Sequence, residues 1–347
     1  MDADLLLLCA FRLWRARVPG RRVRVLVATD DARRYSPDAC LRLLAPWAEW
    51  VTLAGWQELG PDGPRGPAPA ADACLAAVKD PARLAALRAR PPAATLIEPV
   101  VPEKGGPDDD LYSEVCHFDF EFGGWNEWDG RPSKFPGPTL QRLSATGCRE
   151  LYPAFALEGL ARGPRPWRVL DVGCGPVSVL RWGALVGEMT LTGLDPLLEM
   201  YALVRARHGY DALPEIRCAR ELAAFAEELD GLVPDGAFEI VHTQNALDHT
   251  REPERVIGLF AQKLVPGGRV ILQVATREGT RQGWDQLHKT DIDLVDGALV
   301  YRHEHTAERP LLAPDSGLAL ARVHYHGPDW LSVILERTDD APASRAA

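Results

Sequence analysis

Short apolar runs alternate with longer mixed segments through the second half of the chain, from residue 167 onward. Such runs are typical of buried parallel strands, and the segments between them carry apolar residues at helical spacing. The expected strands cover residues 169–172, 189–194, 215–218, 239–243 and 269–275. The expected helices cover residues 177–185, 197–208, 221–229 and 253–264. This alternation predicts a parallel sheet with right-handed crossovers, whose ligands bind at the carboxyl ends of the strands.

The N-terminal part of the chain predicts a separate, smaller α/β module for docking or substrate recognition. Helices are expected at 4–17 and 37–44, strands at 23–28 and 50–53, a Pro- and Gly-rich loop at 60–70, an alanine-rich helix at 71–90 that is interrupted at Pro81, and a short strand at 95–101. We therefore expect an N-terminal module at 1–105, an aromatic-rich lid or connector at 106–165, a catalytic domain at 166–338 and a flexible tail at 339–347.

A glycine turn follows the first strand of the catalytic half. Gly173 and Gly175 remove side chains where the backbone must approach a bound group, and the next helix points its N-terminal amides at the same place. The second strand ends in Asp195, whose carboxylate suits two ribose hydroxyls. Pro176 and Ser178 depart from the dinucleotide pattern Gly-x-Gly-x-x-Gly, so a nucleoside without phosphates fits better than NAD.

At these residues the sequence resembles class I S-adenosylmethionine-dependent methyltransferases. Their first motif is similar to Val169-Leu-Asp-Val-Gly-Cys-Gly175, and later family motifs resemble residues 238–249 and 264–272. The resemblance runs from Trp167 to about Arg337. It implies a doubly wound, mostly parallel, seven-stranded Rossmann-like sheet that binds S-adenosyl-L-methionine. The cofactor contacts that it implies are Asp171, Gly173, Cys174, Gly175, Asp195, Pro196, Leu197, Arg220, Glu221 and Asn245.

Methyl transfer from a sulfonium is an in-line displacement, so the protein must align the reactants, exclude water and remove the proton of the nucleophile. His249, after the fourth strand, is the first candidate for the base, because a histidine titrates near neutrality. Asp248 could orient it, although neighbours at the start of a helix do not face one another. His288, after the fifth strand, is the second candidate. The alternative for both histidines is a packing role.

Aromatic residues crowd the segment before the first catalytic strand. This position resembles the segment that folds over the cofactor as a lid in many small-molecule methyltransferases, and the resemblance implies that Tyr112, Trp125 and Trp128 exclude water and face the sulfonium. Trp284, after the fifth strand, is expected to overhang the methyl group. The alternative is that these rings pack between the two domains.

Composition narrows the choice of partners. The 347 residues carry a net charge of -10, which argues against a nucleic-acid or anionic-membrane surface and favours a small-molecule substrate. The seven cysteines contain no Cys-x-x-Cys pair, and no basic-headed signal peptide or membrane span precedes the first module, so we expect a cytoplasmic protein.

The His-x-His pairs at 303–305 and 324–326 repeat with no carboxylate pattern, so no metal is expected. The oligomeric state stays open.

The sequence thus predicts methylation of an O or N atom on a small metabolite or natural-product intermediate. Two alternatives keep the cofactor: an enzyme that cyclises or transfers its aminocarboxypropyl group and forms methylthioadenosine, and a binding module without turnover. A third, an NAD-linked oxidoreductase, is disfavoured by Pro176 and Ser178.

Overall fold

The computed structural model describes residues 4–60, 63–64, 69–89, 94–104, 106–123, 138–153, 157, 165–210, 213, 217–284 and 287–338. The chain divides into two compact units, residues 1–132 with 199–212 and residues 133–198 with 213–347. The expected connector at 106–165 is therefore shared between the units, and the helix after the second catalytic strand belongs to the first unit. None of the described helices has the length and apolar character needed to cross a bilayer.

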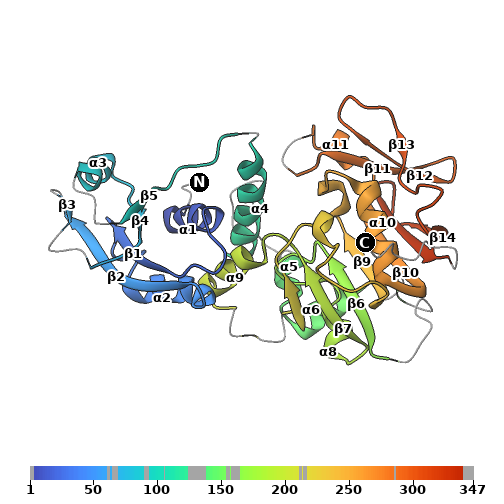
Figure 1. The fold of residues 1–347 in the computed structure, drawn as a ribbon, viewed down its shortest axis with the longest axis horizontal. Coiled ribbons are helices and arrows are strands. Elements are labelled where there is room, and N and C mark those ends of the chain that lie inside the picture. The colour runs from blue at the N-terminus through green and yellow to red at the C-terminus, as the bar shows by residue number, and fades with distance from the viewer. Residues whose placement is uncertain are drawn as a thin grey trace. The chain divides into compact units, whose positions relative to one another are not determined.

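The first unit is built on a five-stranded sheet in the order β3-β2-β1-β4-β5, parallel except for β3 (Figure 1). Its strands are β1 (Val23–Thr29), β2 (Val51–Gly60), β3 (Gly63–Pro64), β4 (Ala73–Ala77) and β5 (Thr95–Ile97). Its helices are α1 (Leu5–Arg15), α2 (Pro37–Leu44), η1 (Ala45–Trp47), α3 (Pro81–Ala89), α4 (Pro107–Phe122) and α9 (Leu198–Arg207).

The helix expected at 71–90 is wrong in its first half. Residues 73–77 form β4, which is wholly buried and lies between β1 and β5. Alanine favours helices in isolation, but a small side chain also suits a central strand covered on both faces. Tertiary packing therefore decides the structure here.

The second unit contains the expected sheet, with seven strands in the order β14-β15-β10-β9-β6-β7-β8. Its strands are β6 (Trp167–Val172), β7 (Met189–Leu194), β8 (Arg220–Leu222), β9 (Phe238–Gln244), β10 (Leu264–Ala275), β14 (Leu318–Tyr325) and β15 (Trp330–Arg337). The five strands from β10 to β8 are parallel, and β15 is antiparallel to both of its neighbours. The mostly parallel α/β class is confirmed.

Short helices and a small second sheet complete this unit. The helices are α5 (Pro138–Gln141), α6 (Ala145–Leu151), α8 (Arg181–Leu185), η3 (Ala226–Glu228), η4 (Leu247–His249), α10 (Pro253–Lys263) and α11 (Glu278–Arg281). The second sheet contains β11 (Thr290–Val295), β12 (Ala298–His303) and β13 (Arg309–Pro310).

The third strand of the parallel sheet lies later in the sequence than expected. A strand is expected at 215–218, but β8 is formed by residues 220–222, which pair with β7. The helix expected at 221–229 is reduced to η3. An edge strand needs few apolar side chains, so its position was poorly marked in the sequence.

Apolar side chains cover both faces of the parallel sheet. Val169, Ile240 and Ile271 belong to one buried cluster. Leu170 and Val241, their neighbours along the strands, belong to the other. Since successive strand residues point to opposite faces, this explains why the strands read as continuous apolar runs.

Candidate functional site

The glycine turn after β6 is closely tied to its neighbours. Gly173 and Gly175 have φ angles of 68° and 62°, a region that favours glycine. The Gly173 amide donates to the Leu194 carbonyl at the end of β7 (2.7 Å). A Cβ on Gly173 would lie 2.2 Å from the Cβ of Ala246, just beyond β9. The turn therefore lies directly against the segment that leads from β9 into η4.

Asp195 lies at the carboxyl end of β7 and is 7% exposed. Its carboxylate accepts hydrogen bonds from the amides of Gly175 (3.1 Å) and Leu197 (2.9 Å). These bonds fix the carboxylate beside the glycine turn, with Pro196 and Leu197 following it. A fixed acceptor beside a bare backbone turn suits the ribose of a nucleoside, as the sequence predicted.

A row of buried polar side chains runs below the turn, across four strands. Asp171 accepts from Ser178 Oγ and lies 2.7 Å from Nδ1 of His242. His242 Nε2 lies 3.2 Å from Gln273 Oε1, and Gln273 donates to Ser332 Oγ (3.1 Å). Asp171 therefore supports the turn from within the sheet, its oxygens bonded to protein groups. His242 and Gln273 were missed, although each is a polar residue inside an apolar strand.

We expect Asp171→Ala to lower the free energy of unfolding by about 2–4 kcal/mol, because His242 and Ser178 would keep buried polar atoms without their partner. Ser178→Ala, which removes only one bond to the same carboxylate, should cost about 1 kcal/mol. Urea unfolding of both variants measures the difference. Equal losses would contradict the view that Asp171 joins the two groups.

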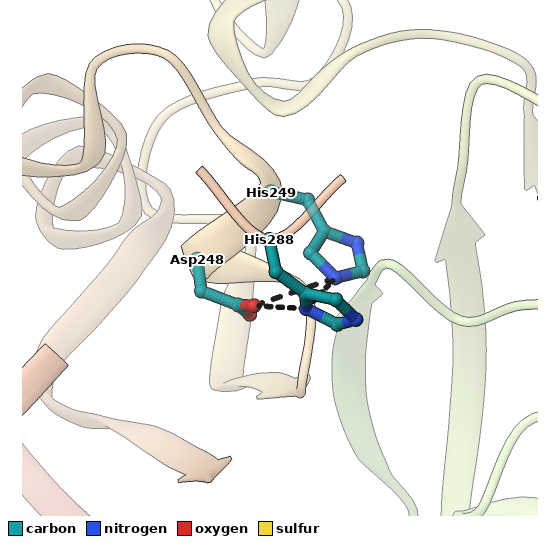
Figure 2. A group of neighbouring side chains, drawn as sticks. All are labelled: Asp248, His249 and His288. Carbon is teal, nitrogen blue, oxygen red and sulfur yellow. Dashed lines mark hydrogen bonds and ion pairs between the residues drawn. The ribbon is translucent and has the colours of Figure 1, made fainter. Parts of the chain in front are cut away.

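Three predicted catalytic side chains converge beyond the ends of β9 and β10 (Figure 2). His249 Nε2 lies 3.3 Å from His288 Nδ1 and 3.4 Å from Asp248 Oδ2. His288 Nδ1 lies 3.1 Å from the same Asp248 oxygen. Asp248 is 1% exposed, whereas both histidines are partly exposed. We call Asp248, His249 and His288 the imidazole cluster.

Asp248 and His249 contact each other despite being adjacent in the sequence, contrary to the expectation for an α-helix. They lie in the single 3₁₀ turn η4, whose tighter winding differs from that of an α-helix. His288 comes from the loop before β11, 39 residues further along. Only the fold brings it to the other two.

Glu278, at the start of α11, extends the imidazole cluster. Its Oε2 lies 3.8 Å from His288 Nδ1, and the residue is 7% exposed. Burial raises the pKa of the Glu278 carboxyl, and the negative charge of Asp248 raises it further. The two imidazoles and a hydrogen bond from Asn245 act in the opposite direction.

Asn245 was predicted as a cofactor contact, and the structure gives its side chain a bridging position. It has a left-handed φ of 49°, and its Oδ1 accepts from the Ala275 amide (3.3 Å). The side chain also lowers the pKa of the Glu278 carboxyl. Asn245 therefore links the end of β9 to the end of β10.

Arg220 and Glu221, expected beyond the third strand, lie within β8 instead. Arg220 donates to the Leu232 carbonyl (3.4 Å), and Glu221 pairs with Arg217 (2.9 Å). Cys174, also predicted at the cofactor, is buried, and its pKa is raised by the neighbouring Cys218 thiol and by burial. None of the seven cysteines forms a disulfide.

The aromatic candidates are dispersed. Tyr112 is buried in the first unit, where its ring centroid lies 5.2 Å from that of Phe11, a packing contact. Trp284 has a φ of 59°, and Arg302 lies over its ring at 5.4 Å. Trp125 and Trp128 lie outside the described residues.

The His-x-His pairs do not form a metal-binding group within the described part of the chain. His303 Nδ1 lies 3.0 Å from Thr290 Oγ1, and the rings of His324 and His326 contact each other edge to face. The described residues place one group of three metal-ligating side chains together, and it is the imidazole cluster.

Comparison with known proteins gives one family match. Residues 141–322, just over half of the chain, match the family described as "Methyltransferase domain". The ubiquinone biosynthesis O-methyltransferase of Cronobacter sakazakii is 32% identical over 114 residues, covering 32% of this chain and 43% of that protein. The chain therefore matches less than half the length of this relative.

Solved structures with similar folds include two methyltransferases. An S-adenosylmethionine-dependent methyltransferase from Mesorhizobium loti has a TM-score of 0.37 and 18% identity, covering 56% of this chain and 98% of that one. The 1,6-didemethyltoxoflavin-N1-methyltransferase of Burkholderia thailandensis has a TM-score of 0.35 and 18% identity, covering 70% of this chain and 95% of that one.

Proposed function

This chain belongs to the methyltransferase domain family, and from that premise we propose that it transfers the methyl group of S-adenosylmethionine to an O or N atom of a small molecule. Family membership confirms the methyltransferase class that the resemblance implied, and with it the cofactor. The acceptor class and the roles of single residues are our proposal.

The residues around the glycine turn fit this cofactor. Gly173 and Gly175 leave the backbone bare, and Asp195 holds a carboxylate beside them for the ribose hydroxyls. Asp171 keeps the turn in shape through Ser178 and His242. When bound, S-adenosylmethionine supplies an electrophilic methyl group on a sulfonium.

The imidazole cluster is the observation that carries the proposal. Ala246, against which Gly173 packs, is three residues before His249, so the turn and the cluster share one edge of the sheet. A neutral imidazole of His249 or His288 accepts the proton of the acceptor hydroxyl or amine. The new bond from O or N to carbon forms as the bond from sulfur to carbon breaks, and sulfur keeps the electron pair.

We expect His249→Ala and His288→Ala each to lower kcat by about 100-fold to 10,000-fold, the usual contribution of a positioned general base. The dissociation constant of S-adenosylhomocysteine should change little, because the variants leave the glycine turn intact. Mass spectrometry of reactions with small phenols, alcohols and amines identifies the acceptor and then measures each variant.

His305→Ala is the matched control, since that imidazole is 89% exposed and lies outside the cluster. Unchanged kcat in both cluster variants would contradict the proposed base. Methylthioadenosine formed from the cofactor alone would instead indicate aminocarboxypropyl chemistry. Tight cofactor binding without product from any acceptor would indicate a binding module.

A further inference from the structure

We propose that the imidazole cluster is a binding site for one divalent cation of the zinc type, ligated by Asp248, His249 and His288, with Glu278 beside it. The binding site itself stands on geometry. Its part in the reaction, described below, rests on the proposed function.

The first argument is the spacing of the three donor atoms. His249 Nε2, His288 Nδ1 and Asp248 Oδ2 form a triangle with sides of 3.1, 3.3 and 3.4 Å. Nitrogen and oxygen ligands about 2.0–2.1 Å from a tetrahedral zinc ion lie about 3.3 Å from one another. The triangle therefore already has the size of one face of a zinc coordination tetrahedron.

Protons alone satisfy this triangle poorly. A neutral imidazole has one N–H, and that hydrogen can point at only one of the other two atoms of the triangle. His288 Nδ1 lies within 3.3 Å of both His249 Nε2 and Asp248 Oδ2. A cation at the centre would bind the lone pairs of all three atoms together.

The second argument is the buried negative charge around the triangle. Asp248 and Glu278 are 1% and 7% exposed, and Asp248 Oδ1 and Glu278 Oε2 have no hydrogen-bond partner. Leaving a buried polar atom unpaired is unfavourable, and the penalty is larger for a charged group. A divalent cation at the centre of the triangle would compensate both carboxylates.

The ligand set selects the class of cation. Two imidazoles and a carboxylate are typical of zinc sites, and also of iron(II) sites, whereas Mg²⁺ and Ca²⁺ prefer oxygen ligands. The ligands come from η4 and from the loop before β11, and the buried Glu278 carboxyl lies 3.8 Å from the His288 ligand atom. Carboxylates beside histidine ligands are typical of metal centres, where they orient the ligands.

Three protein ligands leave a coordination position for the acceptor. If the reaction is the proposed methyl transfer, that position selects an oxygen acceptor, a hydroxyl or phenol, over an amine. Held by Asp248, His249 and His288, the cation would stabilise the oxyanion of a hydroxyl acceptor, whose proton would leave to water. The two histidines would then act as ligands in place of the direct base proposed above, and the methyl group would pass to the oxyanion as the bond to sulfur breaks.

The test uses untagged full-length protein treated with a chelator and then dialysed. Titration with Co²⁺ should give the visible absorption of a tetrahedral site at one equivalent, and Zn²⁺ should displace it. His288→Ala and Asp248→Asn should weaken Co²⁺ binding by at least about 10–100-fold, the loss that is typical even of groups that only support a ligand. His305→Ala, at an exposed imidazole, should bind as the parent protein does.

S-adenosylhomocysteine binding, measured by calorimetry on the same variants, shows that each one is folded. The cation site is overturned if the parent protein takes up no Co²⁺ or Zn²⁺, or if the cluster variants bind them as well as the parent does. Cation binding without methyl transfer would keep the site and reject the proposed function. Methyl transfer without cation binding would keep the proposed function and reject the cation site.

Discussion

Asp195→Ala is expected to weaken the binding of S-adenosylmethionine and S-adenosylhomocysteine by at least about 100-fold. The ribose would lose two hydrogen bonds to a charged acceptor, each worth about 1.5–3 kcal/mol, and 1.4 kcal/mol corresponds to a factor of ten. The amides of Gly175 and Leu197 would also lose their acceptor, which loosens the glycine turn. Isothermal calorimetry with S-adenosylhomocysteine measures the change.

Two further variants separate the ribose contact from general damage. Asp195→Asn keeps the shape and one acceptor oxygen, so it should fall between the parent protein and Asp195→Ala. Glu239→Ala removes a carboxylate at the opposite end of the sheet, where Glu239 pairs with Arg168. Its affinity for S-adenosylhomocysteine should match that of the parent protein. If Asp195→Ala matches it too, the ribose does not bind at Asp195.

The sequence predicted the strands that build the site because they are buried on both faces. The expected 189–194 agrees with β7, and the carboxyl ends of β6, β9 and β10 lie within one residue of the expected carboxyl ends. Continuous apolar runs predict such strands, and the glycine turn and Asp195 come directly after the strand ends in the sequence. The position of the glycine turn could therefore be predicted without tertiary information.

The errors lie where a local pattern competes with packing. The alanine-rich β4 was taken as part of a helix, and the helix expected at 177–185 is reduced to α8 at Arg181–Leu185. The residues before α8 form a turn instead, and Ser178 in that turn donates a hydrogen bond to the buried carboxylate of Asp171. No periodicity in the sequence could reveal that contact.

The imidazole cluster shows the same limit at the site. His249 and His288 were each predicted from a position after a strand, and each was considered as a separate base. Their 3.3 Å contact and the two buried carboxylates depend on how η4, α11 and the loop before β11 fold together. The irregular sequence spacing of these three side chains gives no metal-binding pattern, so the sequence could not indicate that they lie together.

Gly173→Ala is expected to lower the free energy of unfolding by about 2–4 kcal/mol and to abolish measurable cofactor binding. A φ of 68° costs an L-residue about 1–2 kcal/mol. The new methyl group would also lie 2.2 Å from the Ala246 Cβ, and such overpacking adds about 1–3 kcal/mol. Either the turn or the segment into η4 must shift. Urea unfolding and calorimetry with S-adenosylhomocysteine measure the two effects.

The chain offers controls that separate strain from collision. Gly187 has a φ of 75° with nothing within 4 Å of a Cβ, so Gly187→Ala should cost the strain alone and leave cofactor binding intact. Adding Ala246→Gly to Gly173→Ala removes the colliding methyl group, because the Ala246 Cα would lie 3.7 Å away, an ordinary contact. The free energy of unfolding of the double variant should therefore recover to that of Gly187→Ala, and the double variant should bind the cofactor again. If it does not recover, the left-handed backbone of the turn, rather than its packing against Ala246, limits the site.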